Sequence, residues 1–282
     1  MMSEHPMLNV LLPLDGSIPG DTSLMAIHPL IRSGPVKCTL LHVAECEDPP
    51  KSLMTGFQRH REVLESLGVP TRIRVVSGKP AEEVRRQAAS GEFDLVAMST
   101  HGRRGMDRVL MGSVAEEVVR RSTVPTLLCR MGTFAPNWER IVVALSGLAG
   151  AEEVLEDVVG LARRLGASVH LLTVGLNLLR SNSYRGVSFE VPEDESSTYL
   201  DSVASRLLAA GIRVTADRRS GFAADQIACF AKELEAGLIC MTTEGRPEEM
   251  PGLDHSVAAE VIRQAPCPVY VRRMSAASCR SR

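Results

Sequence analysis

Several features that would place a chain in a well-marked class are missing from this sequence. Its formal net charge is -2 over 282 residues, so no field across the whole molecule favours nucleic acid or an anionic membrane. Apolar runs such as VLLPL and ASVHLLTVGL stop far short of the roughly 20 residues that a membrane-spanning helix needs. The opening MMSEHPMLNV carries an acid and a proline where a signal peptide needs basic residues and an apolar stretch. We therefore expect a cytoplasmic protein that binds neither nucleic acid nor membrane.

Motifs for metal binding, disulfide exchange and catalysis are also missing. The seven cysteines include no C-x-x-C pair, and the seven histidines show no HxxxH or HxxEH spacing. We expect buried, reduced thiols and no metal site. There is no Walker A lysine loop, no G-x-G-x-x-G fingerprint and no nucleophile beside a recognisable base. The sequence therefore favours binding over catalysis.

What the sequence does contain is nearly the same segment twice. Residues 77–125 read SGKPAEEVRRQAASGEFDLVAMSTHGRRGMDRVLMGSVAEEVVRRSTVP, and residues 220–268 read SGFAADQIACFAKELEAGLICMTTEGRPEEMPGLDHSVAAEVIRQAPCP. The two segments align without a gap. The opening NVLLPLDGS from Asn9 is answered by RIVVALSGL from Arg140. Self-similarity of this length indicates two copies of one supersecondary unit.

The two copies define two domains, which we place at residues 1–132 and 138–274. The linker is predicted around Met131–Glu139, which contains a glycine and a proline. The second copy is longer between its second and third strands. The extra residues fall within 175–198, a stretch rich in Ser, Asn and Glu that predicts a long surface loop. Each half is long enough to bury a core of its own.

Short apolar runs alternate with helical patterns in each half. In the first half the strand candidates are VLLPL, CTLLHV, TRIRVV, FDLVAMS and PTLLC, most of them apolar at consecutive positions, as in a parallel sheet covered on both faces. Between them, EEVRRQAAS and SVAEEVVRR have the spacing of amphipathic helices. We predict an α/β fold with two tandem doubly wound, Rossmann-like parallel-sheet domains of five strands each. A ligand is expected at the carboxyl ends of the strands, where their order reverses.

Asp15 ends the first predicted strand, and Gly16 after it allows a sharp backbone turn. The carboxylate could accept a hydrogen bond from an amino group of a ligand. It could instead cap the turn or helix that follows, as Asp often does at strand ends. For Asp15 taken alone, the capping role is favoured.

The exit from the fourth predicted strand, MSTHGRRGMDRVLMGSVAEE, has the features of an anion site. Gly102 and Gly105 permit positive φ angles and close backbone approach. Gly112 with Ser113 opens a helix whose N–H groups and dipole attract an anion. Two alternatives stay open. Ser113 followed by Glu116 fits a capping box that needs no ligand, and the arginines of the loop are as readily solvated as bound to phosphates.

With these residues in view, the chain resembles the universal stress protein family along nearly its whole length, as two tandem domains. Nucleotide-binding members of that family carry G-x2-G-x9-G-[S/T] after the fourth strand and P-x-D-x-S at the end of the first. Here Gly102, Gly112 and Ser113 match the first pattern, and Ser99 replaces its first glycine. The P-x-D-x-S sequence is intact at residues 13–17.

The resemblance implies an adenine-nucleotide-alpha-hydrolase-like fold with a nucleotide site in the first domain. Asp15 would contact the adenine, the backbone of Val43 would bond the base, and residues near Gly102 and Gly112 would surround the ribose and phosphates. The implied cofactor is ATP, with or without Mg²⁺, or else AMP or ADP. The implied site consists of Pro13, Asp15, Gly16, Ser17, Val43, Ser99, His101, Gly102, Arg103, Gly105, Gly112, Ser113 and Val114.

The second half departs from this pattern. Ser146 replaces the aspartate, His255 replaces the last glycine of the motif, and Glu248 stands in a loop with further acids. Carboxylates repel a triphosphate, and a Cβ at position 255 blocks close approach of the backbone. Losing two or three contacts of roughly 1.5 kcal/mol each amounts to about 3 to 5 kcal/mol, or about a hundred-fold or more in affinity. We predict that the second domain keeps the fold and not the ligand.

The function that these residues favour is an ATP-binding stress-response regulator in which nucleotide occupancy biases conformation or the choice of protein partner. A slow ATPase or phosphotransfer enzyme using the same pocket is one alternative. A nucleotide-independent protein–protein scaffold is the other.

The closing apolar runs VPTLLCR and CPVYVRR would each form the edge of a sheet, and an unpaired apolar edge invites aggregation. In dimers of the resembled family, equivalent strands pair across the interface. We predict that the two runs pair antiparallel, so that one chain imitates a dimer about a pseudo-two-fold axis. The alternative is two independent domains on a flexible linker. Association of two chains into a homodimer is a further expectation.

Overall fold

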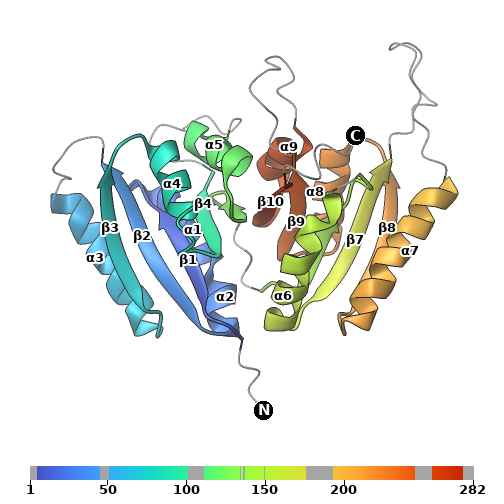
Figure 1. Ribbon diagram of the computed structural model, residues 1–282, viewed down its shortest axis with the longest axis horizontal. Coiled ribbons are helices and arrows are strands. Elements are labelled where there is room, and N and C mark those ends of the chain that lie inside the picture. Colours follow the sequence, from blue (N-terminus) through green and yellow to red (C-terminus); the bar gives the residue numbers. More distant parts are fainter. Residues whose placement is uncertain are drawn as a thin grey trace, which may run out of the picture.

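One ten-stranded sheet runs through both halves of the computed structural model, with helices on both of its faces (Figure 1). The structure describes residues 5–44, 51–100, 111–133, 135, 137–148, 150–175, 193–244 and 256–275. The strands of the first half are β1 (Leu8–Pro13), β2 (Val36–Ala44), β3 (Thr71–Ser77), β4 (Leu95–Ser99) and β5 (Thr126–Cys129). Those of the second half are β6 (Arg140–Ala144), β7 (Ser168–Gly175), β8 (Val214–Ser220), β9 (Leu238–Thr243) and β10 (Val269–Arg273).

The helices connect these strands in an alternating order. The first half has α1 (Ile18–Ala26), α2 (His28–Ser33), α3 (Lys51–Ser66), α4 (Pro80–Ala88) and α5 (Ser113–Arg121). The second half has the 3-10 helix η1 (Ala151–Val154), α6 (Leu155–Leu165), α7 (Glu193–Ala209), α8 (Ala223–Glu233) and α9 (Val257–Gln264). The predicted α/β fold, with five strands in each half, is confirmed.

The strand order is β3-β2-β1-β4-β5-β10-β9-β6-β7-β8. Neighbouring strands within each half are parallel, and β5 and β10 meet antiparallel, with Leu127 opposite Tyr270. The predicted pairing of the two closing strands is therefore confirmed. A crossover between parallel strands returns the chain to the end of the sheet where the previous strand began. The carboxyl ends of all five strands in a half therefore lie at the same end of the sheet, at the top of Figure 1.

Two apolar cores lie on the two faces of the sheet and both cross the junction between the halves. Alternate strand residues feed them, so that Leu12 lies in the core under α1, α3 and α6 while its neighbour Leu11 lies in the core under α4, α5 and α8. The first core contains Leu127 and Tyr270 from the junction strands, and the second contains Leu128 and Val269. The halves therefore share continuous cores.

Arginines connect the halves in a reciprocal way. Arg130 follows β5 and donates to the carbonyl oxygens of Arg263 and, at 3.3 Å, Ala265 at the C-terminal end of α9. Arg273 is its counterpart in the aligned repeat, and it donates to the Arg121 carbonyl at the end of α5 at 3.5 Å. Cations at helix C-termini satisfy the last carbonyls and the dipole. This exchange has the symmetry of a pseudo-two-fold axis.

The segment between β5 and β6 packs onto the protein. Trp138 is 2% exposed, and a Cβ on Gly237 would lie 2.1 Å from the Asn137 carbonyl oxygen, so the backbones meet there closely. With β5 paired to β10, the alternative of two independent domains on a flexible linker is wrong.

The surface loop predicted within 175–198 is partly wrong. Gly175 is the last residue of β7, and α7 begins at Glu193, so the end of the predicted loop is helical. Acidic residues at a helix start are favoured by the dipole. The buried side chains of Leu200, Val203 and Leu207 follow at helical spacing. The polar composition therefore belongs in part to the first turns of an amphipathic helix.

Candidate functional site

The strand order reverses beside β1 in the first half. The chain leaves β1 for β2 on one side, and β4 lies on the other side of β1. Crossovers that leave in opposite directions open a crevice at the carboxyl ends of the two central strands. The residues after β1, at the end of β2, at the end of β4 and at the start of α5 meet around this point.

Asp15 forms a tight turn just after β1. Its Oδ1 atom accepts hydrogen bonds from the Ser17 backbone N–H at 3.0 Å and from the Ser17 hydroxyl at 2.6 Å. Gly16 between them has a φ of 74°, which residues with a Cβ rarely adopt. The turn role considered for Asp15 is therefore present, and it holds a partly buried carboxylate at the rim of the crevice. Pro13, the last residue of β1, leads into this turn.

The end of β2 directs backbone groups toward the same point. The Leu14 N–H donates to the Leu41 carbonyl at 2.9 Å, just past the last pair of β1 and β2. Backbone groups of a strand alternate between its two neighbours. Val43, two residues after Leu41, therefore directs its N–H and C=O to the same side, beyond the last paired residue of β1.

The start of α5 is fastened to the end of β4. The Gly112 N–H donates to the Thr100 carbonyl at 2.7 Å, and the Thr100 N–H donates to the Cys129 carbonyl at 2.9 Å. A Cβ on Gly112 would lie 3.0 Å from the Thr100 oxygen, so this approach favours glycine. Ser99, the last residue of β4, is buried beside this contact. The glycine therefore fixes where the helix starts relative to the sheet.

The N-terminus of α5 carries no side-chain cap among the described residues. Gly112 is the N-cap, Ser113 is the first helical residue, and the first backbone bond runs from the Glu116 N–H to the Gly112 carbonyl at 3.0 Å. The capping box considered for Ser113 and Glu116 is therefore wrong, because the helix starts one residue earlier than that box requires. Glu116 instead pairs with Arg120 at 3.3 Å. The N–H groups of Ser113 and Val114 lie in the first turn, where a helix has no acceptor of its own.

Comparison with known proteins assigns the chain to a family. The model of the universal stress protein family matches residues 7–130 and again residues 137–273. The chain belongs to the universal stress protein family. A universal stress protein of Methanocaldococcus jannaschii is 34% identical over 75 residues, which are 27% of this chain and 44% of that protein. The matched part thus spans less than half of that relative.

Two further relatives extend over most of this universal stress protein. The universal stress protein E homolog of Haemophilus influenzae is 24% identical over 216 residues, covering 68% of this chain and 66% of that protein. The crystal structure of a universal stress protein from Archaeoglobus fulgidus matches with a TM-score of 0.72 at 22% identity, covering 95% of this chain and 97% of that one. The second likeness shows the fold.

The second universal stress protein domain repeats the turn of the first without its charge. Ser146 stands in the place of Asp15, and its hydroxyl accepts the Leu148 N–H at 3.4 Å. Gly147 has a φ of 73°, close to that of Gly16. The hydroxyl thus preserves the turn and leaves no carboxylate at the rim.

The second domain also closes the helix terminus that stays uncapped in the first. Ser256, the counterpart of Ser113, is the N-cap of α9, and its hydroxyl accepts the Ala259 N–H at 3.1 Å. One of the N–H groups that could have met an anion is thus satisfied by the domain's own side chain. The two domains differ at the point where the family motif ends.

Part of the implied site lies outside the described residues. This part comprises His101, Gly102, Arg103 and Gly105; the residues by which the second domain departs from the pattern, His255 and Glu248, also lie outside the described residues. Of the implied site, the structure brings together Pro13, Asp15, Gly16, Ser17, Val43, Ser99, Gly112, Ser113 and Val114 around the carboxyl ends of β1, β2 and β4.

Two supporting residues were missed by sequence reasoning. The Thr100 carbonyl accepts the Gly112 N–H, and a backbone contact of this kind does not depend on which side chain the residue carries. His42 is buried, and its Nδ1 lies 3.2 Å from the Leu14 carbonyl oxygen, just before the Asp15 turn. Its ring meets Phe57 edge to face at 5.6 Å. No spacing in the sequence pairs these residues, since each contact joins segments that only the fold brings together.

Two thiols of the first domain lie buried within the sheet. Burial raises the pKa of the Cys129 thiol to about 12, and it raises the pKa of the Cys38 thiol to about 12 as well. Both are therefore protonated near neutral pH and poor nucleophiles. The expectation of buried thiols is confirmed for Cys38, Cys129, Cys240 and Cys267, whereas Cys229 on α8 is exposed, and Cys46 and Cys279 lie outside the described residues.

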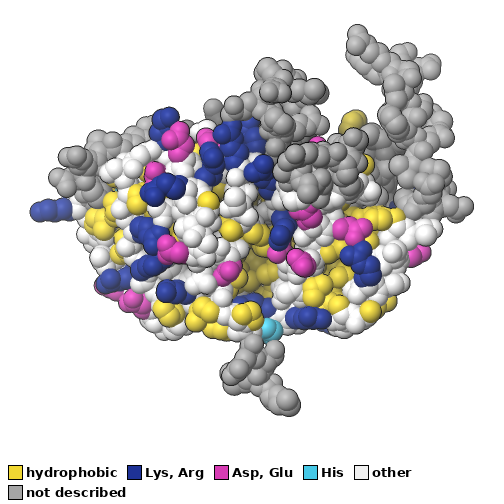
Figure 2. All heavy atoms as spheres, in the orientation of Figure 1, with side chains coloured by type: hydrophobic (Ala, Val, Ile, Leu, Met, Phe, Trp, Pro, Cys, Tyr) yellow, Lys and Arg dark blue, Asp and Glu magenta, His cyan; other side chains and the backbone are white. Residues whose placement is uncertain are grey.

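Surface charge, membrane-spanning helices and metal-binding clusters are the subject of three further findings on the described residues. Figure 2 shows basic side chains gathered over the first half on the face drawn, with acidic side chains interspersed among them. Among the helices in the described part of the chain, none is long and apolar enough to cross a bilayer. The described residues also hold no cluster of three or more His, Cys, Asp or Glu side chains arranged for a metal ion.

Proposed function

We propose that the first domain binds ATP or another adenine nucleotide, that the second domain does not, and that the protein is a stress-response regulator. In this proposal, nucleotide occupancy biases the conformation of the chain or its choice of protein partner. Family membership supports the class of ligand, and the difference between the two copies supports the choice of domain.

The observation that carries the proposal is the helix terminus after the fourth strand of each domain. In the first domain α5 begins without a side-chain cap among the described residues, beside the reversal of strand order. In the second domain the Ser256 hydroxyl takes the Ala259 N–H. A helix N-terminus with unused N–H groups binds phosphate through those groups and the dipole.

The remaining residues fit the two ends of a nucleotide. The phosphates would meet the N–H groups of Ser113 and Val114 and the Ser113 hydroxyl at the start of α5. The base would lie toward β2, where the Val43 backbone directs a donor and an acceptor past the end of β1. The Asp15 carboxylate would accept from the adenine amino group. Mg²⁺, where it is present, would be bound by the phosphates of the nucleotide.

Titration calorimetry with ATP tests this proposal on the full chain. We expect a stoichiometry near one, and we expect Gly112→His to abolish the signal, because it copies the second domain and puts a Cβ 3.0 Å from the Thr100 oxygen. The matched control is His255→Gly, which should add no second site because Ser256 still caps α9. Thermal unfolding of both variants separates lost binding from lost folding. Two equivalent sites, or full binding by a folded Gly112→His protein, would refute the proposal.

Two further measurements separate the alternatives. Nucleotide released by acid from freshly purified protein, and identified by chromatography, distinguishes a nucleotide binder from a scaffold. Multiple-turnover phosphate release then distinguishes an enzyme from a regulator. We expect bound adenine nucleotide and no sustained turnover.

A further inference from the structure

A cavity lies on the first domain, at the opposite end of the strands from the candidate nucleotide site. Its volume is about 180 Å³. It lies at the amino ends of β1, β2 and β3, beside the turn that connects α4 to β4. Its lining residues are Asn9, Lys37, Thr39, Arg72, Glu92 and Phe93. No step of the proposed function uses this cavity.

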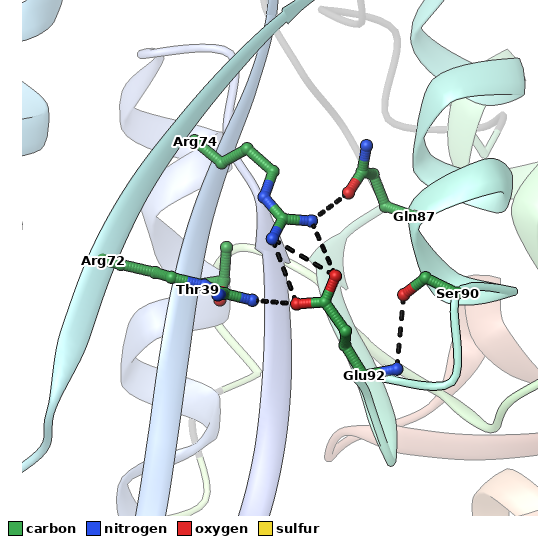
Figure 3. Close-up of polar contacts among 6 residues, drawn as sticks. All are labelled: Thr39, Arg72, Arg74, Gln87, Ser90 and Glu92. Carbon is green, nitrogen blue, oxygen red and sulfur yellow. Dashed lines mark hydrogen bonds and ion pairs between the residues drawn. The ribbon is translucent and has the colours of Figure 1, made fainter.

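Two arginines from β3 converge on one carboxylate at this cavity (Figure 3). Arg72 donates through Nε to the buried Thr39 hydroxyl at 2.9 Å and forms an ion pair with Glu92. Arg74 binds Glu92 through Nη2 at 3.1 Å and donates to the side-chain oxygen of Gln87 on α4. Both guanidinium groups therefore already hold an oxyanion, and that oxyanion belongs to the chain itself.

The two guanidinium groups lie over the face of a buried aromatic ring. The Phe93 ring is 5% exposed, and the guanidinium carbons of Arg72 and Arg74 lie 5.9 Å and 5.8 Å from its centre. Aromatic faces attract guanidinium groups and restrict their orientation. The donors are therefore held in place before any ligand arrives.

Positive charge exceeds negative charge around the cavity. Lys37 and Arg72 line the cavity with Glu92, and Arg74 and Asp94 lie just behind them, Arg74 bound to Glu92 at 3.1 Å and Asp94 bound to the nitrogens of Asn9 at 2.8 Å and 3.0 Å. Because the amide groups of Asn9 are neutral, Asp94 keeps its charge, and three positive charges face two negative ones. Hydrogen bonds from Arg72 and then Arg74 hold the pKa of Glu92 below its usual value, so this carboxylate is ionised near neutral pH. Lys37 has no hydrogen bond or ion pair among the described residues. One lysine ammonium is thus left for an incoming anion.

We propose that this cavity binds a small phosphate-type anion, which competes with the Glu92 carboxylate for Arg72 and Arg74 and is held from the other side by Lys37. The volume is below the roughly 300 to 1,000 Å³ of pockets for drug-sized ligands, so a whole nucleotide is too large. Fixed guanidinium forks and an ammonium are the groups that bind phosphate oxygens in proteins. One positive charge remains after Glu92 and Asp94 are counted, and it attracts an anion.

The second domain shows the same place without these donors. By the internal alignment, Ser168 replaces Lys37, His170 replaces Thr39 and Thr215 replaces Arg72. The His170 ring connects the Thr215 hydroxyl at 2.8 Å to the Ser168 hydroxyl at 3.1 Å, which is a closed network of neutral groups. Glu235, the equivalent of Glu92, forms an ion pair with Arg140 at 3.0 Å. The anion site therefore belongs to the first domain alone.

The test is a titration of the full chain with inorganic phosphate at constant ionic strength, followed by calorimetry and by backbone amide shifts. We expect one saturable site with shifts at Asn9, Glu92 and Phe93. Lys37→Ala should weaken binding by about tenfold or more, since it removes a charge-assisted bond. Glu92→Gln should strengthen binding, because the competing carboxylate is gone. Lys232→Ala, an equal loss of charge on the exposed surface of α8, is the matched control and should leave binding unchanged.

The opposite signs of the two variants separate a binding site from a structural ion pair. If Glu92 serves only to fasten the turn, Glu92→Gln cannot tighten phosphate binding, and unchanged or weaker binding overturns the proposal. Absence of saturable binding overturns it as well. So does loss of phosphate binding in the Gly112→His protein, because the phosphate would then occupy the candidate nucleotide site. The same titration with glycerol 3-phosphate identifies the source: tighter binding than inorganic phosphate assigns the site to phosphate monoesters, and weaker binding assigns it to the free ion.

Discussion

At the scale of single residues, the tandem repeat separates two roles that one aspartate could serve. Asp15 and Ser146 both accept the N–H of the residue two positions later, at 3.0 Å and 3.4 Å, and each is followed by a glycine with positive φ. The turn therefore needs an oxygen acceptor, and it does not need a charge. The proposed function assigns the charge of Asp15 to contact with the ligand.

This comparison predicts the result of Asp15→Ser. The variant should keep the turn, as Ser146 does, and lose the charged acceptor for the adenine amino group. A hydrogen bond to a charged group contributes about 2 kcal/mol, so ATP affinity should fall about thirty-fold. Calorimetry measures the affinity, and thermal unfolding should show a midpoint close to that of the unaltered protein. ATP affinity that stays the same would show that Asp15 serves the turn alone.

At the scale of elements, the strands could be predicted from the sequence because their surroundings are uniform. The runs that form β1, β4 and β5 are apolar at consecutive positions since both faces of the sheet are covered, with Leu11 and Leu12 in opposite cores. The long helix α3 was not predicted. Its buried side chains are those of Leu53, Phe57 and Leu64, and the polar run QRHRE separates the last two.

The candidate site was predictable in its location but not in its contacts. The family pattern pointed to the end of β4, and the topology placed that end beside β1. The cap was misread because S-x-x-E is only a local pattern. Ser113 has that pattern and does not cap, since the Gly112 N–H is bound to Thr100 and the helix starts at Ser113 itself. Ser256 lacks the pattern and does cap.

The two serines therefore predict opposite effects of the same substitution. Ser256→Ala removes the cap of α9 and should lower the free energy of unfolding by about 1 kcal/mol, with no effect on ATP affinity. Ser113→Ala removes no cap, so it should leave stability nearly unchanged and weaken ATP binding. Denaturant unfolding and calorimetry on both proteins give the four values. Equal destabilisation by the two substitutions would contradict the difference in caps.

At the scale of the whole molecule, one chain has the arrangement of a dimer. The antiparallel pairing of β5 with β10 covers the edge that each half would otherwise expose, and the reciprocal contacts of Arg130 and Arg273 follow the same pseudo-symmetry. The two outer edges, β3 and β8, carry charged side chains, which discourage further strand pairing. The edges of β5 and β10 are therefore paired with each other, and the charged edges of β3 and β8 disfavour the addition of further strands.

Cutting the chain at the linker should convert this internal pairing into association between molecules. A protein made of residues 1–132 would expose β5, whose Leu127 and Leu128 are 0% and 1% exposed in the full chain. Two such edges can pair antiparallel as β5 and β10 do, so sedimentation should show a dimer. Leu128→Pro in the same fragment is the control, because the backbone of Leu128 faces β10, so proline there removes a donor from the exposed edge and should yield monomers. Small-angle scattering of the full chain should fit one compact particle. A monomeric fragment together with an extended two-bead profile of the full chain would show that the halves are held by the linker and not by the shared sheet.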